Sequence, residues 1–130
     1  MSRLTHINAP SGVFPATQYT HVVMGTGRFV AIAGQLALDK DGKLVGEGDP
    51  AAQARQVFDN LWHCLVAAGG SFRDVVKLTY YVTDMAYMPD IRAARDTYMD
   101  PERLPAASAV QVSALVAPQF LMEIEAYAVL

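Results

Sequence analysis

The hydrophobic and polar positions near the C-terminus alternate along two segments. From residue 121 onward every second residue is apolar, and this set comprises Met122, Ile124, Ala126 and Ala128. The residues between them are Glu123, Glu125 and Tyr127. Because successive side chains of a strand point to opposite faces, this pattern predicts a strand with one buried and one open face. Residues 107–115 alternate less strictly and predict a second half-buried strand, and Pro118 marks a loop between the two.

Two segments carry apolar residues at helical spacing. The first begins at Asp49, which can cap free backbone amides, and continues through Pro50 at the first helical position. We expect this helix to end at Ala68, because Gly69 follows it and glycine commonly terminates helices. A second helix is predicted after residues 84–89, ending at 100–101, where the residue before a proline avoids helical angles.

The remaining strands are predicted from short β-branched and aromatic runs. Residues 19–24 and 28–33 are separated by 25–27, Gly-Thr-Gly, and this spacing indicates a hairpin. The second of these runs is nearly all apolar, so we expect it to be covered on both faces. Residues 75–83 predict another strand, and a short extended segment is expected around Leu44. Residues 1–17 contain two prolines and a glycine, which predicts an irregular, mostly extended arm.

The order of these elements predicts an α+β fold, a two-layer α/β sandwich. Each helix crosses between strands, so both helices are expected on one face of a six-stranded mixed sheet. The opposite face of the sheet is then bare in a single chain. Glu123, Glu125 and Tyr127 are expected on that face, which suits a subunit interface.

Composition narrows the classes of function. The 130 residues fit one domain, 1–130, and 52% hydrophobic against 18% charged residues favours an oligomer that covers apolar surface. A net charge of −3 without a run of basic residues argues against a nucleic-acid partner. The single cysteine, Cys64, cannot form an internal disulfide, and neither a signal peptide nor an apolar run of ~18 to 20 residues is evident. We therefore expect a cytoplasmic protein with no membrane partner.

Several short motifs, in the same order along nearly the whole chain, resemble the RidA family, also called YjgF. They are Gly34-Gln35, Gln53-Ala-Arg-Gln-Val-Phe-Asp-Asn-Leu61, Ala67-Ala-Gly69, Val76-Lys77, Val82-Thr-Asp84-Met85, Pro105-Ala106-x-Ser108 and Glu123-Ile-Glu-Ala126. The resemblance implies a chorismate-mutase-like fold and a homotrimer whose sheets form a central barrel. It also implies ligand clefts between subunits, because the best known members are enamine/imine deaminases that hydrolyse products of amino-acid dehydratases.

The chain departs from the deaminase pattern at four polar positions of that cleft. The family motif Pro-Ala-Arg-Ser has an arginine that binds the substrate carboxylate, and Ala107 takes its place here. The family's cysteine, tyrosine and serine positions correspond to Ala109, Ala16 and Ala33. What remains is Glu123, which matches the carboxylate thought to orient water, and the backbone at Gly34. The resemblance thus makes Glu123 the candidate catalytic residue and the other five the candidate ligand-binding residues.

The substitution at Ala107 changes the expected ligand. An alanine cannot replace a planar, permanently charged guanidinium. A charge-assisted pair is worth ~1.5 to 3 kcal/mol, so 2-iminobutanoate is expected to bind poorly and a less acidic small molecule is favoured. Three functions stay open. The chain is a deaminase of an enamine or imine, a non-catalytic trimer that binds a metabolite or a partner protein, or a ribonuclease. The acidic composition, without a basic groove for RNA, argues against the third.

Other polar residues have weaker functional interpretations. Arg92 and Arg95 could reach the cleft and replace the missing cation, although a solvated helix face is the commoner role of such residues. Glu125 is expected to be structural, and Cys64 to be an inert apolar side chain on the first helix. The three tyrosines that could line a cleft or simply pack are Tyr80, Tyr81 and Tyr127. None of the three histidines has a neighbour at metal-ligand spacing, so neither a metal nor a cofactor is expected.

Overall fold

Six strands and two α-helices form the chain in the computed structural model, which describes residues 4–130. The strands are β1 Thr5–Ile7, β2 Val22–Met24, β3 Phe29–Gln35, β4 Val75–Val82, β5 Ala106–Gln111 and β6 Met122–Val129. The helices are α1 Pro50–Ala68 and α2 Met88–Arg95, with short 3-10 turns η1 Phe72–Asp74 and η2 Met85–Tyr87. The predicted α+β fold is confirmed.

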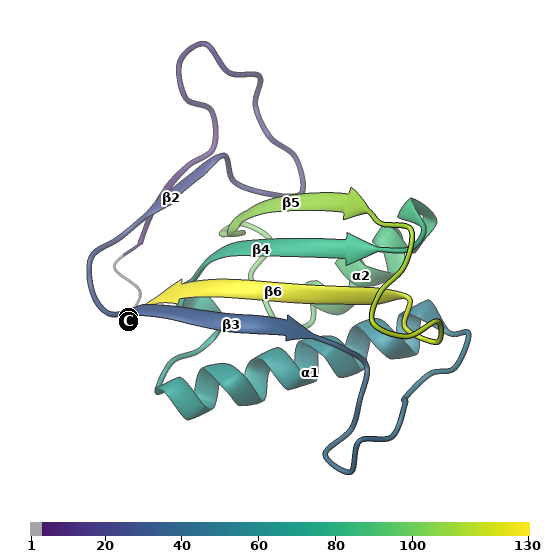
Figure 1. The fold of residues 1–130 in the computed structure, drawn as a ribbon. Coiled ribbons are helices and arrows are strands. Elements are labelled where there is room, and N and C mark those ends of the chain that lie inside the picture. Colours follow the sequence, from purple (N-terminus) through teal and green to yellow (C-terminus); the bar gives the residue numbers. More distant parts are fainter. Residues whose placement is uncertain (1–3) are drawn as a thin grey trace.

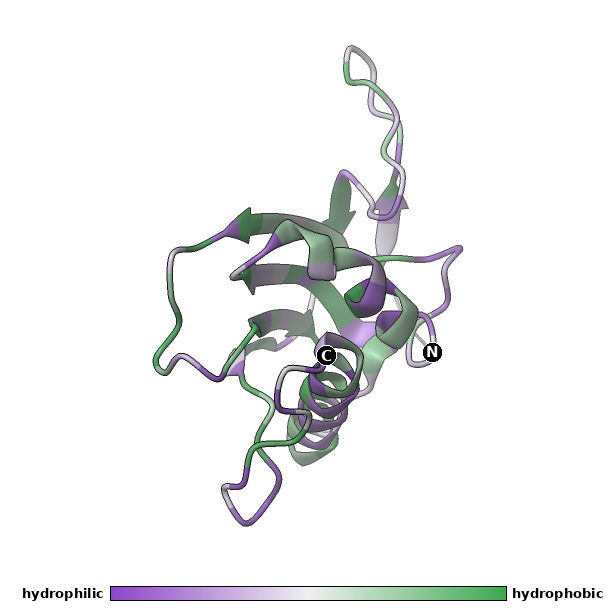
Figure 2. Cartoon of the chain, turned by 90° about the vertical axis from the view of Figure 1, so that its right-hand side faces the viewer, coloured by the Kyte–Doolittle hydropathy of each residue, from purple (hydrophilic) through white to green (hydrophobic). Residues whose placement is uncertain are grey.

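The main sheet has four strands in the order β3-β6-β4-β5. Strand β6 runs antiparallel to both β3 and β4, whereas β4 and β5 run parallel through the crossover that contains α2. Both helices lie on the same face of this sheet, as predicted (Figure 1). The view turned by 90° shows the two layers edge-on (Figure 2). Strands β3 and β5 are therefore the two free edges of the sheet.

The predicted hairpin between residues 19–24 and 28–33 is wrong. Strand β2 pairs with β1, which lies inside the segment expected to be irregular, and these two strands form a separate small sheet. The next run instead pairs with the C-terminal strand, because Arg28 and Leu130 exchange two backbone hydrogen bonds of 2.8 and 2.9 Å. The six strands that form are thus divided between a two-stranded and a four-stranded sheet, and the segment expected to be extended around Leu44 makes only an isolated bridge with Leu38.

Local signals at the ends of α1 are confirmed by its geometry. The Asp49 carboxylate accepts a hydrogen bond from the Ala52 amide at 3.1 Å, and Gly69 takes a left-handed conformation with φ of 87°. The inner face of the helix packs against β3 and β6. Its fully buried apolar residues are Ala54, Val57, Phe58, Leu61 and Leu65. The capping residues therefore mark the two ends of this helix, and the apolar spacing marks the face that packs on the sheet.

The alternation in β6 is also confirmed. The four apolar residues at its even positions are completely buried against the helices. Gln53 of α1 fixes the start of this strand, since its side chain donates to the carbonyls of Gly46 and Gln119 and accepts from the Leu121 amide, each at 3.0 Å. Because that side chain is fully buried, these bonds hold the strand's odd-numbered side chains on the open face.

Two further expectations about burial are wrong for the single chain. Strand β3 is covered on one face only, and Phe29 on its open face is 66% exposed. Strand β5 ends at Gln111 and is largely exposed. No helix within residues 4–130 has the length and apolar character to cross a membrane. That same part of the chain brings together no group of three side chains suited to a metal ion.

Candidate functional site

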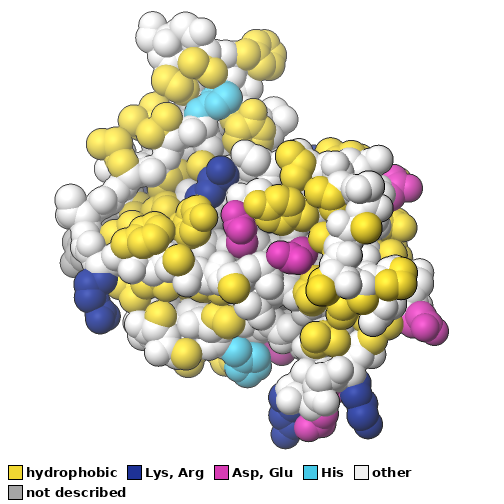
Figure 3. All heavy atoms as spheres, viewed as in Figure 1, with side chains coloured by type: hydrophobic (Ala, Val, Ile, Leu, Met, Phe, Trp, Pro, Cys, Tyr) yellow, Lys and Arg dark blue, Asp and Glu magenta, His cyan; other side chains and the backbone are white. Residues whose placement is uncertain are grey.

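Glu123 lies directly against the backbone of Gly34 on the open face of the sheet. A Cβ atom added to Gly34 would lie 2.6 Å from both Cγ and Cδ of Glu123, closer than carbon atoms pack. Acidic side chains stand near the middle of this face, with apolar groups around them (Figure 3). The glycine therefore leaves the space that the Glu123 side chain occupies.

A bulge in β3 shapes the backbone beside this carboxylate. The pairing of β3 with β6 shifts register between Ile32 and Gln35, so Ala33 and Gly34 fall outside the regular ladder. The Gln35 side chain folds back and donates to the Ala33 carbonyl at 3.1 Å. Bulges commonly re-aim side chains near functional sites. Three of the predicted site residues, Ala33, Gly34 and Glu123, are thus brought together.

The neighbouring carboxylate, that of Glu125, already accepts a hydrogen bond. The Tyr81 hydroxyl donates to Glu125 at 3.3 Å, from the adjacent strand β4. Burial raises the pKa of Tyr81, and the negative charge of Glu125 raises it further, so the hydroxyl keeps its proton at neutral pH. No residue of the described chain, 4–130, donates a hydrogen bond to the Glu123 side chain. Of the two carboxylates, Glu123 is the one free to bind a water or a ligand.

A groove of about 840 Å³ runs along the β3 edge, and Gly34 forms part of its wall. Its other walls come from residues 35–40 and from the polar side of α1, including Gln56, Asn60 and His63. Asn60 donates to the carbonyls of Leu36 and Leu38, both at 2.9 Å, which holds the segment after β3 against the helix. We call this space the β3-edge groove.

A second cavity, of about 650 Å³, lies at the opposite edge of the sheet. Ala107 and Ala109 of β5 form one wall and Tyr80 of β4 forms another. The remaining walls come from α2, through Arg92 and Arg95 among others, and from residues 17–19 of the N-terminal arm. We call this space the β5-edge cavity. Ala16, another predicted site residue, is buried immediately before the arm residues that line it.

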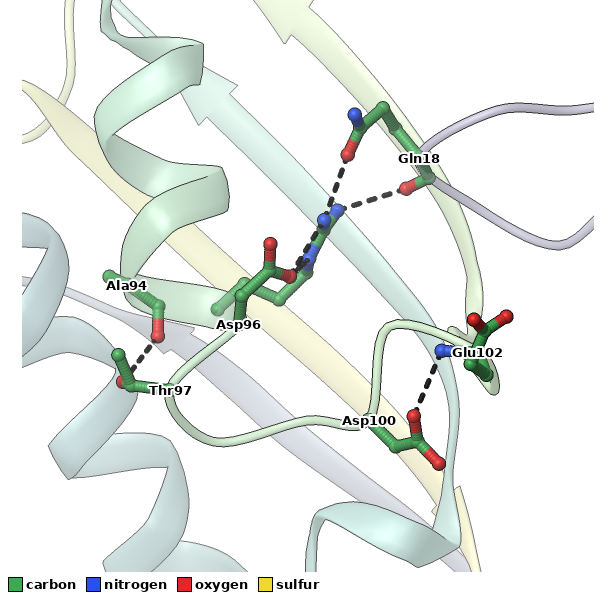
Figure 4. A network of polar contacts seen from close by, with 7 residues as sticks. Gln18, Ala94, Asp96, Thr97, Asp100 and Glu102 are labelled. Atoms are coloured by element: carbon green, nitrogen blue, oxygen red, sulfur yellow. Dashed lines mark hydrogen bonds and ion pairs between the residues drawn. The ribbon is translucent and has the colours of Figure 1, made fainter.

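Arg95 anchors the arm to the cavity. Its guanidinium donates to both the backbone carbonyl and the side-chain oxygen of Gln18, each at 2.9 Å, and to Asp96 at 2.9 Å (Figure 4). Gln18 has a φ of 69°, a conformation that costs energy for any residue other than glycine. The Arg95 side chain is only 2% exposed. The expectation of a solvated helix face is therefore wrong for Arg95.

Arg92, one turn earlier on α2, lines the same cavity without such partners. Within residues 4–130 its guanidinium forms no hydrogen bond or ion pair, and the residue is half-buried. Tyr80, 3% exposed, completes this side of the cavity. Burial raises the pKa of the Tyr80 hydroxyl, which the positive charges of Arg95 and Arg92 only partly oppose. Two arginines thus line the same cavity as Ala107, where the family resemblance implies the loss of one.

The two regions do not meet within one chain. In the sheet register, Tyr81 lies opposite Glu123, whereas Tyr80 lies opposite Ile124 and Ala109. Glu123 consequently faces the open side of the sheet, and Ala107 and Ala109 face the helical side near the other edge. The predicted site residues therefore form two separate halves.

Little in the sequence indicates that the arm contributes to the β5-edge cavity. Gln18, Thr17 and Tyr19 line the β5-edge cavity but carry no motif that marks them. Arg92 and Arg95 are spaced so that they lie on one face of α2, and this spacing was a usable sequence signal that they act together. Met88, on the same face, also lines the cavity. Which face of α2 is buried was not evident from that spacing alone.

Comparison with known proteins identifies close relatives over nearly the whole chain. Residues 8–130 match the family model described as endoribonuclease L-PSP. A 3-aminoacrylate deaminase of Acinetobacter baylyi is 38% identical over 114 residues, 88% of this chain and 83% of its own. A 2-iminobutanoate/2-iminopropanoate deaminase of Mus musculus is 36% identical over 121 residues, 93% of this chain and 85% of its own. The crystal structure of a Rid family protein of unknown function from Yersinia pestis superposes with a TM-score of 0.87 at 37% identity, covering 99% of this chain and 100% of that one.

Replacing Gly34 with alanine tests the close approach of Glu123. Because Gly34 does not require a left-handed conformation, we expect the Gly34→Ala chain to fold, with a loss of stability of about 1 kcal/mol in urea denaturation. The added methyl group has to displace the Glu123 carboxylate, and a crystal structure of the variant should show that side chain in a new rotamer. Gly42→Ala is the control: its φ of 78° is strained for alanine, so it also loses stability, but its added methyl group meets nothing and Glu123 stays in place. A Glu123 side chain that does not move would contradict the geometry described.

Proposed function

The chain belongs to the endoribonuclease L-PSP family, also called RidA or YjgF, and we propose that it is a cytoplasmic homotrimeric hydrolase of a small enamine or imine. The observation that carries this proposal is the Glu123 carboxylate, held against Gly34 and free of hydrogen bonds from the described chain. Such a group can orient and deprotonate a water molecule. The two relatives named as deaminases are consistent with that chemistry.

Assembly into a ring would complete the site. The Gly34 bulge lies on β3 and the β5-edge cavity on β5, the two free edges of the sheet, so a head-to-tail contact would bring the cavity of one chain up to the strand that borders Glu123 of the next. Apolar residues on the open face and on the arm support such a contact, because Phe29 is 66% exposed and Phe14 is 89% exposed. Three chains close the ring in the arrangement that the family resemblance implies.

The proposed reaction is hydrolysis of a carbon–nitrogen double bond, which an enamine reaches after tautomerising to the imine. Glu123 accepts a proton from water as the water oxygen attacks the imine carbon. The same carboxylic acid passes that proton to the imine nitrogen, which gives a neutral carbinolamine. Glu123 then takes the hydroxyl proton of the carbinolamine and delivers it to the nitrogen as the carbon–nitrogen bond breaks, so both water protons end on ammonia and a carbonyl compound is released. The steps consume one water and leave Glu123 unchanged, so they require neither a metal nor a cofactor.

The substrate we propose is not 2-iminobutanoate handled in the usual way. In the arginine-bearing deaminases that the chain resembles, an arginine on the strand equivalent to β5 holds the carboxylate beside the reacting carbon. Ala107 offers no such contact, which removes a charge-assisted hydrogen bond worth about 1.5 to 3 kcal/mol. Ala109, Ala33 and Ala16 also make the walls less polar than in those enzymes.

A non-catalytic role is the second candidate, and those four alanines are the observation that favours it. A trimer that only binds a metabolite or a protein would be stabilised by its ligand and leave that ligand unchanged. Cleavage of RNA has less support, despite the family's description, because the net charge is −3 and neither cavity is bordered by a basic run.

Replacing Glu123 with glutamine tests the proposed base. Glutamine keeps the size of the side chain but cannot accept a proton, so hydrolysis of the imines that the wild type turns over should fall by about 10² to 10⁴. Ammonia release from a panel of enzymatically generated imines, charged and uncharged, measures this. Glu125→Gln is the matched control, since Glu125 is bonded to Tyr81, and it should stay within about threefold of the wild type. Equal rates for Glu123→Gln and the wild type would remove Glu123 from the mechanism.

Restoring the strand arginine tests the assignment of Ala107. The Ala107→Arg chain should hydrolyse 2-iminobutanoate with a kcat/KM about ten to a hundred times that of the wild type, because the carboxylate regains its partner. Ala107→Gln adds a side chain of comparable reach without the charge and should give little improvement. If the unmodified chain already hydrolyses 2-iminobutanoate as fast as its arginine-bearing relatives, the inference from Ala107 is wrong.

A further inference from the structure

The lining of the β5-edge cavity contains two arginines, Arg92 and Arg95, and within residues 4–130 it includes no aspartate or glutamate. The other polar groups there are hydroxyls and an amide, which supply hydrogen bonds but no negative charge. The cavity is therefore suited to an anionic group rather than a cation.

Arg95 is largely committed to contacts within its own chain. Its Nε donates to Asp96 and each of its two terminal nitrogens donates to Gln18. Asp96 also lies 2.9 Å from a terminal nitrogen and neutralises the charge. Arg95 acts instead as a positioning residue, since it holds the arm that forms one wall of the cavity.

Arg92 keeps its full bonding capacity. It is half-buried and its guanidinium has no partner in the part of the chain that the structure describes. A partly desolvated guanidinium without a counter-ion is unfavourable, and its planar fork matches a carboxylate in two parallel hydrogen bonds. The Tyr80 hydroxyl lines the same cavity and remains protonated at neutral pH, because burial raises its pKa. Two hydrogen-bond donors, the Arg92 guanidinium from α2 and the Tyr80 hydroxyl from β4, thus belong to residues that line the same cavity.

We propose that Arg92, assisted by the Tyr80 hydroxyl, binds a carboxylate of the ligand in the β5-edge cavity. The anchor for an acidic ligand is then supplied by helix α2 and not by strand β5. This revises the expectation of a less acidic ligand, which rested on the absence of a cation near Ala107. The reaction of such a ligand rests on the proposed hydrolase function, whereas its binding does not.

The position of the anchor also bears on the class of ligand. Arg92 of α2 and Ala107 of β5 belong to different elements that line the cavity. A carboxylate bound by Arg92 is thus held by another wall than the one that carries the family's arginine. Small imines or enamines whose acidic group is not adjacent to the reacting carbon, as it is in 2-iminobutanoate, therefore join the candidate ligands.

A pair of ketones that differ only in the acid tests this anchor. We would titrate the intact oligomer with 4-oxopentanoate and with pentan-2-one and measure both dissociation constants by NMR. The wild type should bind the acid at least about ten times more tightly than the neutral ketone. Arg92→Ala should abolish this difference, Arg92→Lys should retain part of it, and Tyr80→Phe should weaken binding of the acid severalfold.

The controls separate this proposal from loss of fold and from failure of the proposed function. Arg55→Ala removes an exposed arginine of α1 that lines neither space and should leave both constants unchanged. Each variant's melting temperature and oligomeric state show whether it is folded. If Arg92→Ala binds 4-oxopentanoate as tightly as the wild type, or if the wild type does not distinguish the acid from the ketone, the anchor is refuted. Preference for the acid without hydrolysis of any imine would support the anchor and count against the hydrolase.

Discussion

The pairing of β6 between β3 and β4 is the interaction on which the rest of the structure depends. Every second residue of β6 is sealed against the helices, which leaves no freedom of register, because a shift by one residue would bury Glu123 and expose the core. The same pairing leaves β3 and β5 as unpaired edges. Unpaired edges expose backbone donors and acceptors and favour association with another chain. The candidate site and the proposed assembly therefore follow from one arrangement of strands.

The two arginines of α2, Arg92 and Arg95, have different roles. Arg95 is buried and fully bonded, and it compensates for the unfavourable conformation of Gln18 by fixing the arm in place. Arg92 remains unpaired beside Tyr80 in the cavity that the arm completes. In this proposal the cleft lacks the arginine of strand β5 and uses hydrogen-bond donors from helix α2 and strand β4 instead. A prediction made from the β5 motif alone would miss these donors.

Features specified by neighbouring residues were predictable from the sequence. Helix α1 is fixed by Asp49, Pro50 and Gly69, and the faces of β6 are fixed by strict alternation. Features set by distant contacts were not predictable. The expected hairpin does not form because Arg28 pairs with Leu130, which is distant in the sequence, and Arg95 is bonded to Gln18, 77 residues away. The candidate residues of the site were identified, but their separation into two halves required the sheet order.

The most direct test of this account asks whether one site is built from two chains. Glu123→Gln disables the β3-edge half, and Ala109→Trp fills the β5-edge cavity of the other half. Mixed trimers, isolated by two affinity tags after co-expression, each pair one intact Glu123 with one open cavity. We predict that they regain about a third of the wild-type imine hydrolysis, although each parent trimer is inactive. Mixed trimers no more active than their parents would show that the two halves do not form a shared site.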